Sequence, residues 1–317
     1  MKTKNIWILG GTGFIGSALV RHLSENPKNS LHLLVHRNVP YRSLESHNTF
    51  TGSLENFDLA WMEKYSPDVI FHLARLGGSN AFTRNLSSYK GAKANYRLIR
   101  CLESMKKPPT LVYVSGSLMY GHQTSGNPID EYASLSPVSY AKYYIRGEEP
   151  WIEAQTKASL DIRFARPGWI LGPASWFRIF YWQHYVKTGK IPLFGDGQQR
   201  MSLIHVDDCA GQIANLAEKG SKLQNLNIFS GPPVTQEIFA ETLASLLQTQ
   251  TETISVKTLK NEFGNTVTEA LTSSIPLQTK YCEMASIYIP KYPDLEAMLV
   301  KTLSALKHHE AVFSKTP

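Results

Sequence analysis

The sequence is poor in cysteine and has no long apolar run. Three cysteines (Cys101, Cys209 and Cys282) among 317 residues cannot build a disulfide framework or a cysteine-based metal site, and they favour a reducing, cytoplasmic location. Without a run of about 18 apolar residues, no membrane-spanning helix is expected. The opening residues, MKTKNIWILGG, also lack the apolar region of roughly 7–15 residues that a secretion signal needs.

Clusters of basic residues are absent as well. The chain holds 33 Lys+Arg and 26 Asp+Glu, a formal charge of +7, yet nowhere do four basic residues follow one another. Because nucleic-acid sites need such residues gathered on one face, we expect a solvated, dispersed charge and no nucleic-acid partner. Binding of a phosphorylated small molecule stays open as a use for part of this charge.

What the chain does have is alternation of short apolar runs with helical patterns, which predicts βαβ units and a parallel sheet with helices on both faces. The predicted strands are Asn5–Leu9, Leu31–Val35, Asp68–Leu73, Thr110–Val114 and Leu160–Ala165, and the predicted helices are Phe14–Ser24, Leu54–Tyr65 and Lys93–Met105.

The second half of the chain differs in composition, because Gly, Pro and aromatic residues crowd Pro167–Gly197. Helices are expected over Trp176–Thr188, Val206–Lys219 and Thr235–Leu247. We therefore predict an α/β protein with a nucleotide-binding domain over residues 1–168 and a smaller α/β substrate lobe over 169–317. With no Gly/Ser linker between them, the two parts should be packed together and partly interleaved.

A glycine-rich turn joins the first predicted strand to the first predicted helix. In its G-x-x-G-x-x-G spacing, Gly10 permits a tight turn, Gly13 lets the backbone approach a pyrophosphate, and Gly16 lets the helix pack closely on the strand. The helix N-terminus adds free N–H groups and a positive dipole. We predict dinucleotide binding by Gly10, Thr12, Gly13, Phe14, Ile15 and Gly16; the alternative is a plain tight turn.

The end of the second predicted strand bears on the choice of dinucleotide. NAD is normally bound there by a carboxylate on the ribose 2′-hydroxyl, but Leu31–Val35 runs into His36 and Arg37. A guanidinium suits a 2′-phosphate by charge and geometry. The sequence therefore favours NADP(H) over NAD(H), and a solvated surface arginine is the alternative.

Several further segments, in order along the chain, resemble the extended short-chain dehydrogenases/reductases, the NAD(P)-dependent epimerase/dehydratase family. This resemblance implies a Rossmann-type doubly wound parallel sheet, a small-molecule substrate of the nucleotide-sugar or sugar-phosphate kind, and homodimerisation through helices of the first domain as one option. The segments are GGTGFIG (10–16), DVIFHLA (68–74), Asn95, VYVSGSLMYG (112–121), RPGWILGP (166–173), GDGQQR (195–200) and HVDD (205–208).

The same resemblance implies individual contacts. Gly52, Ser53 and Leu54 would meet the adenine, and Leu73, Ala74 and Arg75 would pass along the dinucleotide. Pro167, Gly168 and Ile170 would lie against the nicotinamide, with Ser115 and Tyr140 near it, and Ser117 would face the substrate. Arg200 resembles an arginine that meets a substrate phosphate; a surface salt bridge is the equal alternative.

The catalytic segment departs from the family pattern of a serine or threonine, a tyrosine, and a lysine four residues after the tyrosine. Tyr140 matches the tyrosine, but Tyr144 stands at the lysine position and Gly116 at the serine position. Lys142 is about 200° round a helix from Tyr140, so it cannot replace the ammonium. Ser115 and Ser117 flank the vacant serine position and are weak candidates for its role.

Two functional hypotheses follow from this departure. The protein is an oxidoreductase or epimerase/dehydratase that uses another proton carrier, for which His72, Tyr143, Tyr144 or a substrate group are options. Alternatively, it binds NADP(H) as a sensor or scaffold and has lost its catalysis, because a tyrosine of pKa about 10 is a weak base without a neighbouring ammonium.

No metal site is expected. Asp207 and Asp208 resemble a metal pair, but we expect them to cap the helix that runs to Lys219. His308, His309 and Glu310 lie in a polar tail without further ligands nearby in the sequence.

Overall fold

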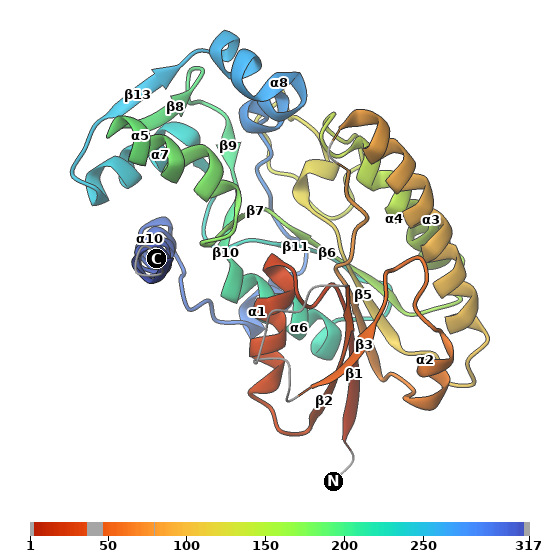
Figure 1. Cartoon of the computed structure of the whole chain (residues 1–317). Helices are drawn as coiled ribbons and strands as arrows, with labels where there is room; N and C mark the ends of the chain where they lie inside the picture. Colours follow the sequence, from red (N-terminus) through yellow and green to blue (C-terminus); the bar gives the residue numbers. More distant parts are fainter. Residues whose placement is uncertain (1–2, 37–46, 79, 314–317) are drawn as a thin grey trace.

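The computed structural model describes residues 3–36, 47–78 and 80–313. A sheet of seven parallel strands lies at its centre, in the order β3-β2-β1-β4-β5-β6-β11 (Figure 1). This confirms the predicted α/β architecture with a Rossmann-type parallel sheet. Its strands are β1 (Lys4–Leu9), β2 (Asn29–Val35), β3 (Asn48–Thr51), β4 (Val69–His72), β5 (Thr110–Val114), β6 (Ile162–Pro167) and β11 (Asn225–Ile228).

The strand order places a ligand crevice beside β1. The chain moves from β1 outward to β2 and β3, and then returns to the other side of β1 with β4. At such a reversal, the connections that leave the carboxyl ends of the two neighbouring strands separate and open a crevice. The turn after β1 and the turn after β4 therefore meet at one edge of the sheet.

Helices cover both faces of the sheet. On one face, α1 (Phe14–Ser24) and α6 (Val206–Lys219) pack over apolar side chains such as Ile8 and Leu33. On the other, α2 (Ala60–Lys64), α3 (Ala81–Glu103) and α4 (Lys142–Thr156) cover a second cluster around Trp7 and Trp151. Figure 1 shows α3 and α4 side by side along that face.

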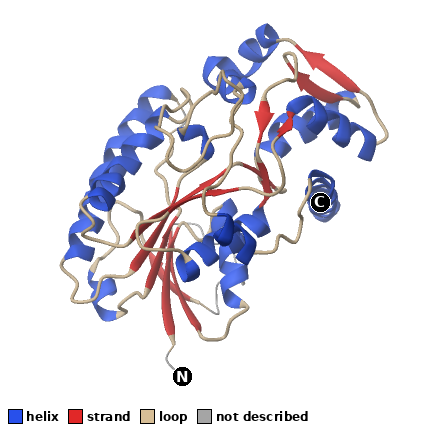
Figure 2. Ribbon diagram, turned by 180° about the vertical axis from the view of Figure 1, so that it is seen from behind, coloured by secondary structure: helices blue, strands red, loops and turns tan. Residues whose placement is uncertain are grey.

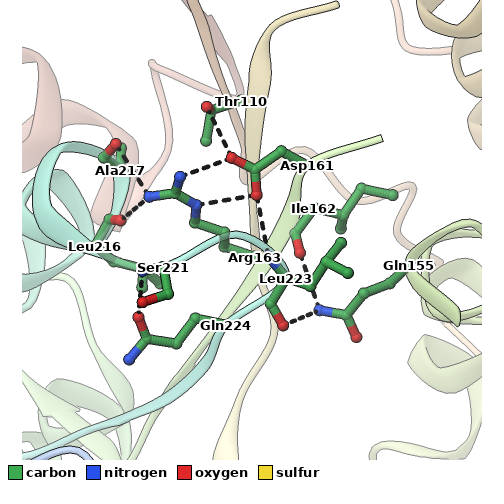
Figure 3. Close-up of polar contacts among 10 residues, drawn as sticks. All are labelled: Thr110, Gln155, Asp161, Ile162, Arg163, Leu216, Ala217, Ser221, Leu223 and Gln224. Atoms are coloured by element: carbon green, nitrogen blue, oxygen red, sulfur yellow. Dashed lines mark hydrogen bonds and ion pairs between the residues drawn. The ribbon is translucent and has the colours of Figure 1, made fainter. Parts of the chain in front are cut away.

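A polar clamp ties β6 to the end of α6 (Figure 3). The Arg163 guanidinium donates to both carboxylate oxygens of Asp161, at 3.1 and 2.6 Å, and to the carbonyl of Leu216 at 2.8 Å. Burial would raise the pKa of Asp161, but hydrogen bonds, first among them those from Arg163, hold that pKa below its ordinary value. A cation at the last carbonyls of a helix also complements the helix dipole.

The C-terminal lobe has its own apolar core around Phe177, Tyr181 and Phe239. Figure 2 shows its short strands and helices beside the large sheet. The strand pairs are β7 (Trp169–Leu171) with β10 (Leu203–His205), β8 (Ile191–Phe194) with β13 (Thr251–Ile254), and β9 (Arg200–Met201) with β12 (Val234–Thr235). The remaining helical segments are η2 (Ser117–Met119), η3 (Arg178–Trp182), α5 (Gln183–Thr188), α7 (Gln236–Leu246), α8 (Val256–Thr272), α9 (Cys282–Ile287) and α10 (Leu295–Phe313).

Several predicted helices differ from the observed ones. The helix expected over Leu54–Tyr65 is only the short α2, and the one expected over Lys93–Met105 is the second half of α3. The helix expected over Trp176–Thr188 is present with these bounds, but its middle, η3, is a π-helical turn that runs directly into α5.

The expected cap of α6 was wrong. The side chain of His205, not of Asp207 or Asp208, accepts the capping hydrogen bond, from the N–H of Asp207 at 3.3 Å. Asp207 pairs with Arg21 at 3.0 Å. The buried Asp208 accepts hydrogen bonds from the Tyr288 hydroxyl and from two backbone N–H groups, so it anchors the segment that leads to α10.

Candidate functional site

A cavity of about 600 Å³ opens at the carboxyl ends of β1, β4, β5 and β6. Its walls come from both parts of the chain. The glycine-rich turn, the residues after β4 and β5, and the start of α4 form one side, whereas β7, η3 and α8 form the other. The volume lies within the range of roughly 300–1,000 Å³ that is usual for small-molecule sites.

The glycine-rich turn is built so that side chains are excluded. Gly10 has a positive φ of 95°, and a Cβ there would lie 2.8 Å from the backbone nitrogen of Ala74. A Cβ on Gly16 would lie 2.0 Å from the carbonyl oxygen of Gly10. Both positions therefore require glycine, which is the physical reason for two of the three glycines in the motif.

The N-terminus of α1 fits the pyrophosphate of a dinucleotide. The helix begins after Gly13, no side chain caps it, and its first turn holds no acidic residue. The N–H groups of the first turn are thus left to an anion, which the helix dipole also attracts. Together with the cradle of the glycine turn, this end of the cavity suits NAD or NADP.

Most residues predicted to meet the cofactor or substrate line this cavity, but not all. Thr12, His36, Gly52, Ser53, Leu54, Ala74 and Arg200 are not part of its wall, and Arg37 lies outside the described residues. The predicted residues that do line it are Gly10, Gly13, Phe14, Ile15, Gly16, Leu73, Arg75, Ser115, Ser117, Tyr140, Pro167, Gly168 and Ile170.

The segment Pro167–Ile170 reaches the cavity because the chain changes sheets there. The N–H of Gly168 still donates to Ile228 in the large sheet at 2.9 Å, but the N–H of Trp169 donates to Ser202 in the lobe at 2.7 Å. A Cβ on Gly168 would lie 2.2 Å from the Ser202 carbonyl oxygen, so this crossing point needs glycine.

Tyr140 and Tyr144 lie together in the cavity wall. Tyr140 precedes α4 and is 39% exposed, and its ring meets the ring of Tyr144 edge to face, with centroids 5.8 Å apart. Burial, reinforced by the neighbouring Tyr140, raises the pKa of Tyr144 to about 12. The Tyr144 hydroxyl therefore stays protonated at neutral pH.

The two candidate serines differ in their surroundings. The Ser115 hydroxyl donates a short hydrogen bond to the buried carboxylate of Glu148, which also pairs with Arg166 at 2.7 Å. This network holds Ser115 in a structural role. Ser117 also lines the cavity, and within the described part of the chain no hydrogen bond holds its hydroxyl.

His72 is held away from the chemistry. Its ring is buried, packs against Tyr113 and Trp151, and bonds to Asn95 through Nε2 at 2.9 Å. Burial lowers the pKa of His72 to about 4, partly offset by the bond to Asn95. His72 does not line the cavity, and the structure gives it the packed strand-end role rather than that of a proton carrier.

Arg200, expected near a substrate phosphate, is engaged elsewhere. Its Nη1 donates to the carbonyl of Gly126 at 2.9 Å, and its backbone N–H to the hydroxyl of Ser274 at 3.1 Å. Tyr143, another option for a proton carrier, has the guanidinium of Arg84 over its ring at 5.8 Å.

Among the described residues, no group of three or more potential metal ligands comes together. A search of the same residues for a membrane-spanning helix found none of sufficient length and hydrophobicity.

The sequence analysis did not identify the individual residues that line the cavity on the side of the C-terminal lobe. Trp176, Ile179 and Phe180 come from η3 and the helical residues just before it, while Val267 and Leu271 come from α8. The crowding of aromatic residues after Pro167 was a usable signal for the first group. Nothing in the pattern of α8 distinguishes residues that face a cavity from residues that face a core.

Comparison with known proteins adds to this geometry. A family model, the NAD dependent epimerase/dehydratase family, matches residues 6–229, more than half of the chain. The chain belongs to this family. Among curated members, an uncharacterized UDP-glucose epimerase, YtcB, from Bacillus subtilis (strain 168) is 28% identical over 236 residues, covering 68% of this chain and 72% of the relative. GDP-L-fucose synthase 1 from Arabidopsis thaliana is 25% identical over 262 residues, covering 76% and 77%.

Solved structures of the family share the fold. A UDP-N-acetylglucosamine 4-epimerase from Methanobrevibacter ruminantium M1, in complex with UDP-N-acetylmuramic acid, superposes with a TM-score of 0.79 at 19% identity, covering 98% of this chain and all of the other. The human epimerase family protein SDR39U1, solved with NADPH, gives 0.74 at 19% identity, covering 95% and 99%. At such identities the likeness establishes the fold.

Proposed function

We propose that the protein binds an NADP(H) dinucleotide along the glycine-rich turn and acts as an oxidoreductase on a hydroxyl or carbonyl group of a small substrate. The observation that carries the proposal is the uncapped N-terminus of α1 behind a turn in which Gly10 and Gly16 leave no room for a Cβ. A bound nicotinamide supplies or takes up the hydride. The preference for NADP rests on His36 and Arg37, where NAD-binding members need a carboxylate.

In this proposal Tyr140 moves the proton of the substrate hydroxyl through its phenolic oxygen. Tyr140 and Tyr144 are the tyrosines among the described wall residues; burial raises the pKa of Tyr144 to about 12, whereas the side chain of Tyr140 is 39% exposed and so can reach a substrate. Ser117 is placed to orient the substrate oxygen. Arg75, the cationic side chain of the described wall, lies against Tyr144.

Two measurements test the proposal. Arg37→Ala should weaken binding of NADPH much more than binding of NADH, and equal effects would remove the 2′-phosphate assignment. In a screen of carbonyl substrates with NADPH, Tyr140→Phe should abolish turnover. Turnover that survives this change would show that another group moves the proton.

A second candidate function is a non-catalytic NADP(H) sensor or scaffold. Tyr144 at the lysine position and Ser115 held by Glu148 favour it, because both remove parts of the ordinary catalytic set. Tight NADPH binding without turnover of any carbonyl or nucleotide-sugar compound would select this function over the first.

A further inference from the structure

The lobe half of the cavity wall is apolar. Of the lobe residues that line it, only Ser175 has a polar side chain apart from the indoles, and its hydroxyl already donates to the carbonyl of Gly172 at 2.8 Å. No lobe residue of the described wall carries a charge. The large side chains on this side are Trp169, Trp176, Ile179, Phe180, Val267 and Leu271.

A nucleotide sugar would find no free cation on this wall. Its pyrophosphate needs Arg or Lys donors or the free N–H groups of a helix N-terminus, because a desolvated phosphate without them is costly, and in the proposed function the N-terminus of α1 is occupied by the dinucleotide. Among the described wall residues only Arg75 is cationic, and its guanidinium donates to the carbonyls of Val114 and Ser115, at 3.1 and 2.9 Å, on the dinucleotide side. Arg200 donates to Gly126 and lies outside the wall.

The aromatic part of the wall is fixed by packing. The rings of Trp169 and Trp176 meet edge to face with centroids 5.0 Å apart, and the ring of Trp176 also packs against Tyr181 and Phe239. Phe180, in the π-helical turn, packs on Phe263 at 5.1 Å. Such preformed aromatic surfaces favour flat, apolar rings by burial and by ring–ring contact. Next to them Ile179 is still 51% exposed, so a ligand can cover it.

From this wall we infer that the substrate is an uncharged, mainly apolar ring alcohol or ketone, and that nucleotide sugars are poor ligands. The position of the reacting group at Tyr140 is taken from the proposed function, on which the inference rests in this respect. The chemical class of the substrate is inferred from the composition of the lobe wall. It also departs from the substrates that the names of the curated relatives suggest.

The test compares 2-tetralone, an uncharged bicyclic ketone, with UDP-glucose by isothermal titration calorimetry, with and without saturating NADPH. We expect 2-tetralone to bind at least about tenfold more tightly. A smaller preference, a preference for UDP-glucose, or binding of neither compound would overturn the inference. If NADPH itself does not bind, the proposed function fails, while the comparison without NADPH still decides the inference.

A charged substitution locates the binding. Ile179→Arg should weaken 2-tetralone binding at least about tenfold while leaving the NADPH dissociation constant within about twofold. Ile289→Arg is the matched control, because Ile289 is 83% exposed and lies outside the cavity wall; it should change neither affinity. Unchanged 2-tetralone binding in Ile179→Arg would place the ligand elsewhere and overturn the inference.

Discussion

The guanidinium of Arg75 lies over the ring of Tyr144, with its central carbon 4.9 Å from the ring centre. Tyr144 stands where members of the resembled family have a catalytic lysine, so a cation still contacts this position, but from the turn after β4 rather than from α4. Arg75 is held there by two backbone carbonyls as well as by the ring. A guanidinium therefore contacts Tyr144, although no lysine stands at this position of α4.

Removing that charge should weaken dinucleotide binding. Arg75→Met is expected to raise the NADPH dissociation constant by about tenfold, because a charge-assisted contact is worth roughly 1.5–3 kcal/mol. Arg84→Met is the matched control, since Arg84 lies over Tyr143 and outside the cavity wall. Nicotinamide fluorescence measures both affinities, and an equal effect of the two substitutions would argue against a role of Arg75 in the site.

Restoring the missing catalytic groups should raise turnover. Gly116 has an extended backbone, with φ 178°, and a Cβ there would find its nearest heavy atom 4.0 Å away, so a serine fits. Gly116→Ser combined with Tyr144→Lys should speed NADPH oxidation with 2-tetralone at least about tenfold, since positioned acid–base groups contribute about 10²–10⁴-fold. Tyr144→Leu with Gly116→Ser removes the ring without adding an ammonium. If this variant gains as much, the lysine is not the cause.

The buried Glu148 should be essential for stability. Glu148→Ala leaves Arg166, which is 4% exposed, without its carboxylate and Ser115 without its acceptor. Loss of one partner of a buried ion pair costs about 3–5 kcal/mol. The exposed neighbour Glu149 offers the control, for which Glu149→Ala should change the free energy of unfolding by less than about 0.5 kcal/mol. Urea unfolding compares the two, and a similar small change in both would contradict this role.

Stability should fall with acid because of His72. Burial holds the folded-state pKa of His72 at about 4, below the ordinary value of 6.5, so the unfolded chain binds more protons between these values. The free energy of unfolding should therefore drop as the pH falls from about 6.5 to 4, by on the order of 3 kcal/mol from this residue. His72→Gln should flatten this part of the profile in urea unfolding at pH 7 and pH 4.5. Because His32 and His205, whose pKa values are also lowered, remain in both proteins, the difference isolates His72; parallel profiles would contradict the assignment.

The regular part of the fold could be predicted because its signals are local. The strands β1, β4 and β5 are continuous apolar runs, and α1 and α6 begin and end at the residues that their patterns indicate. The first turns of α3 were missed because FTRNLSSYKG is polar and partly exposed. The start of α3 is marked by Asn80 and Thr83, which cap the helix with reciprocal hydrogen bonds. This pair of residue types at a spacing of three is a helix-start signal that can be seen in the sequence.

The parts of the site that escaped prediction depend on contacts between distant residues. Ser115, Glu148 and Arg166 meet only when β5, α4 and β6 are packed, and no spacing in the sequence shows it. Likewise the engagement of Arg200 with Gly126 spans 74 positions. The glycine turn could be located because its function needs a fixed local spacing, whereas the lobe wall needs only apolar residues, which cores also use.

Titration of NADPH into the purified protein tests the central claim most directly, with nicotinamide fluorescence as the signal. The account predicts saturable binding by the unaltered protein and by Gly77→Ala, since a Cβ on Gly77 meets nothing within 4 Å. It predicts loss of binding in Gly16→Val, where the new side chain would meet the Gly10 carbonyl, with circular dichroism to confirm that the variant is folded. An unaltered protein that binds neither NADPH nor NADH, or a folded Gly16→Val that binds as well as the unaltered chain, would contradict the claim.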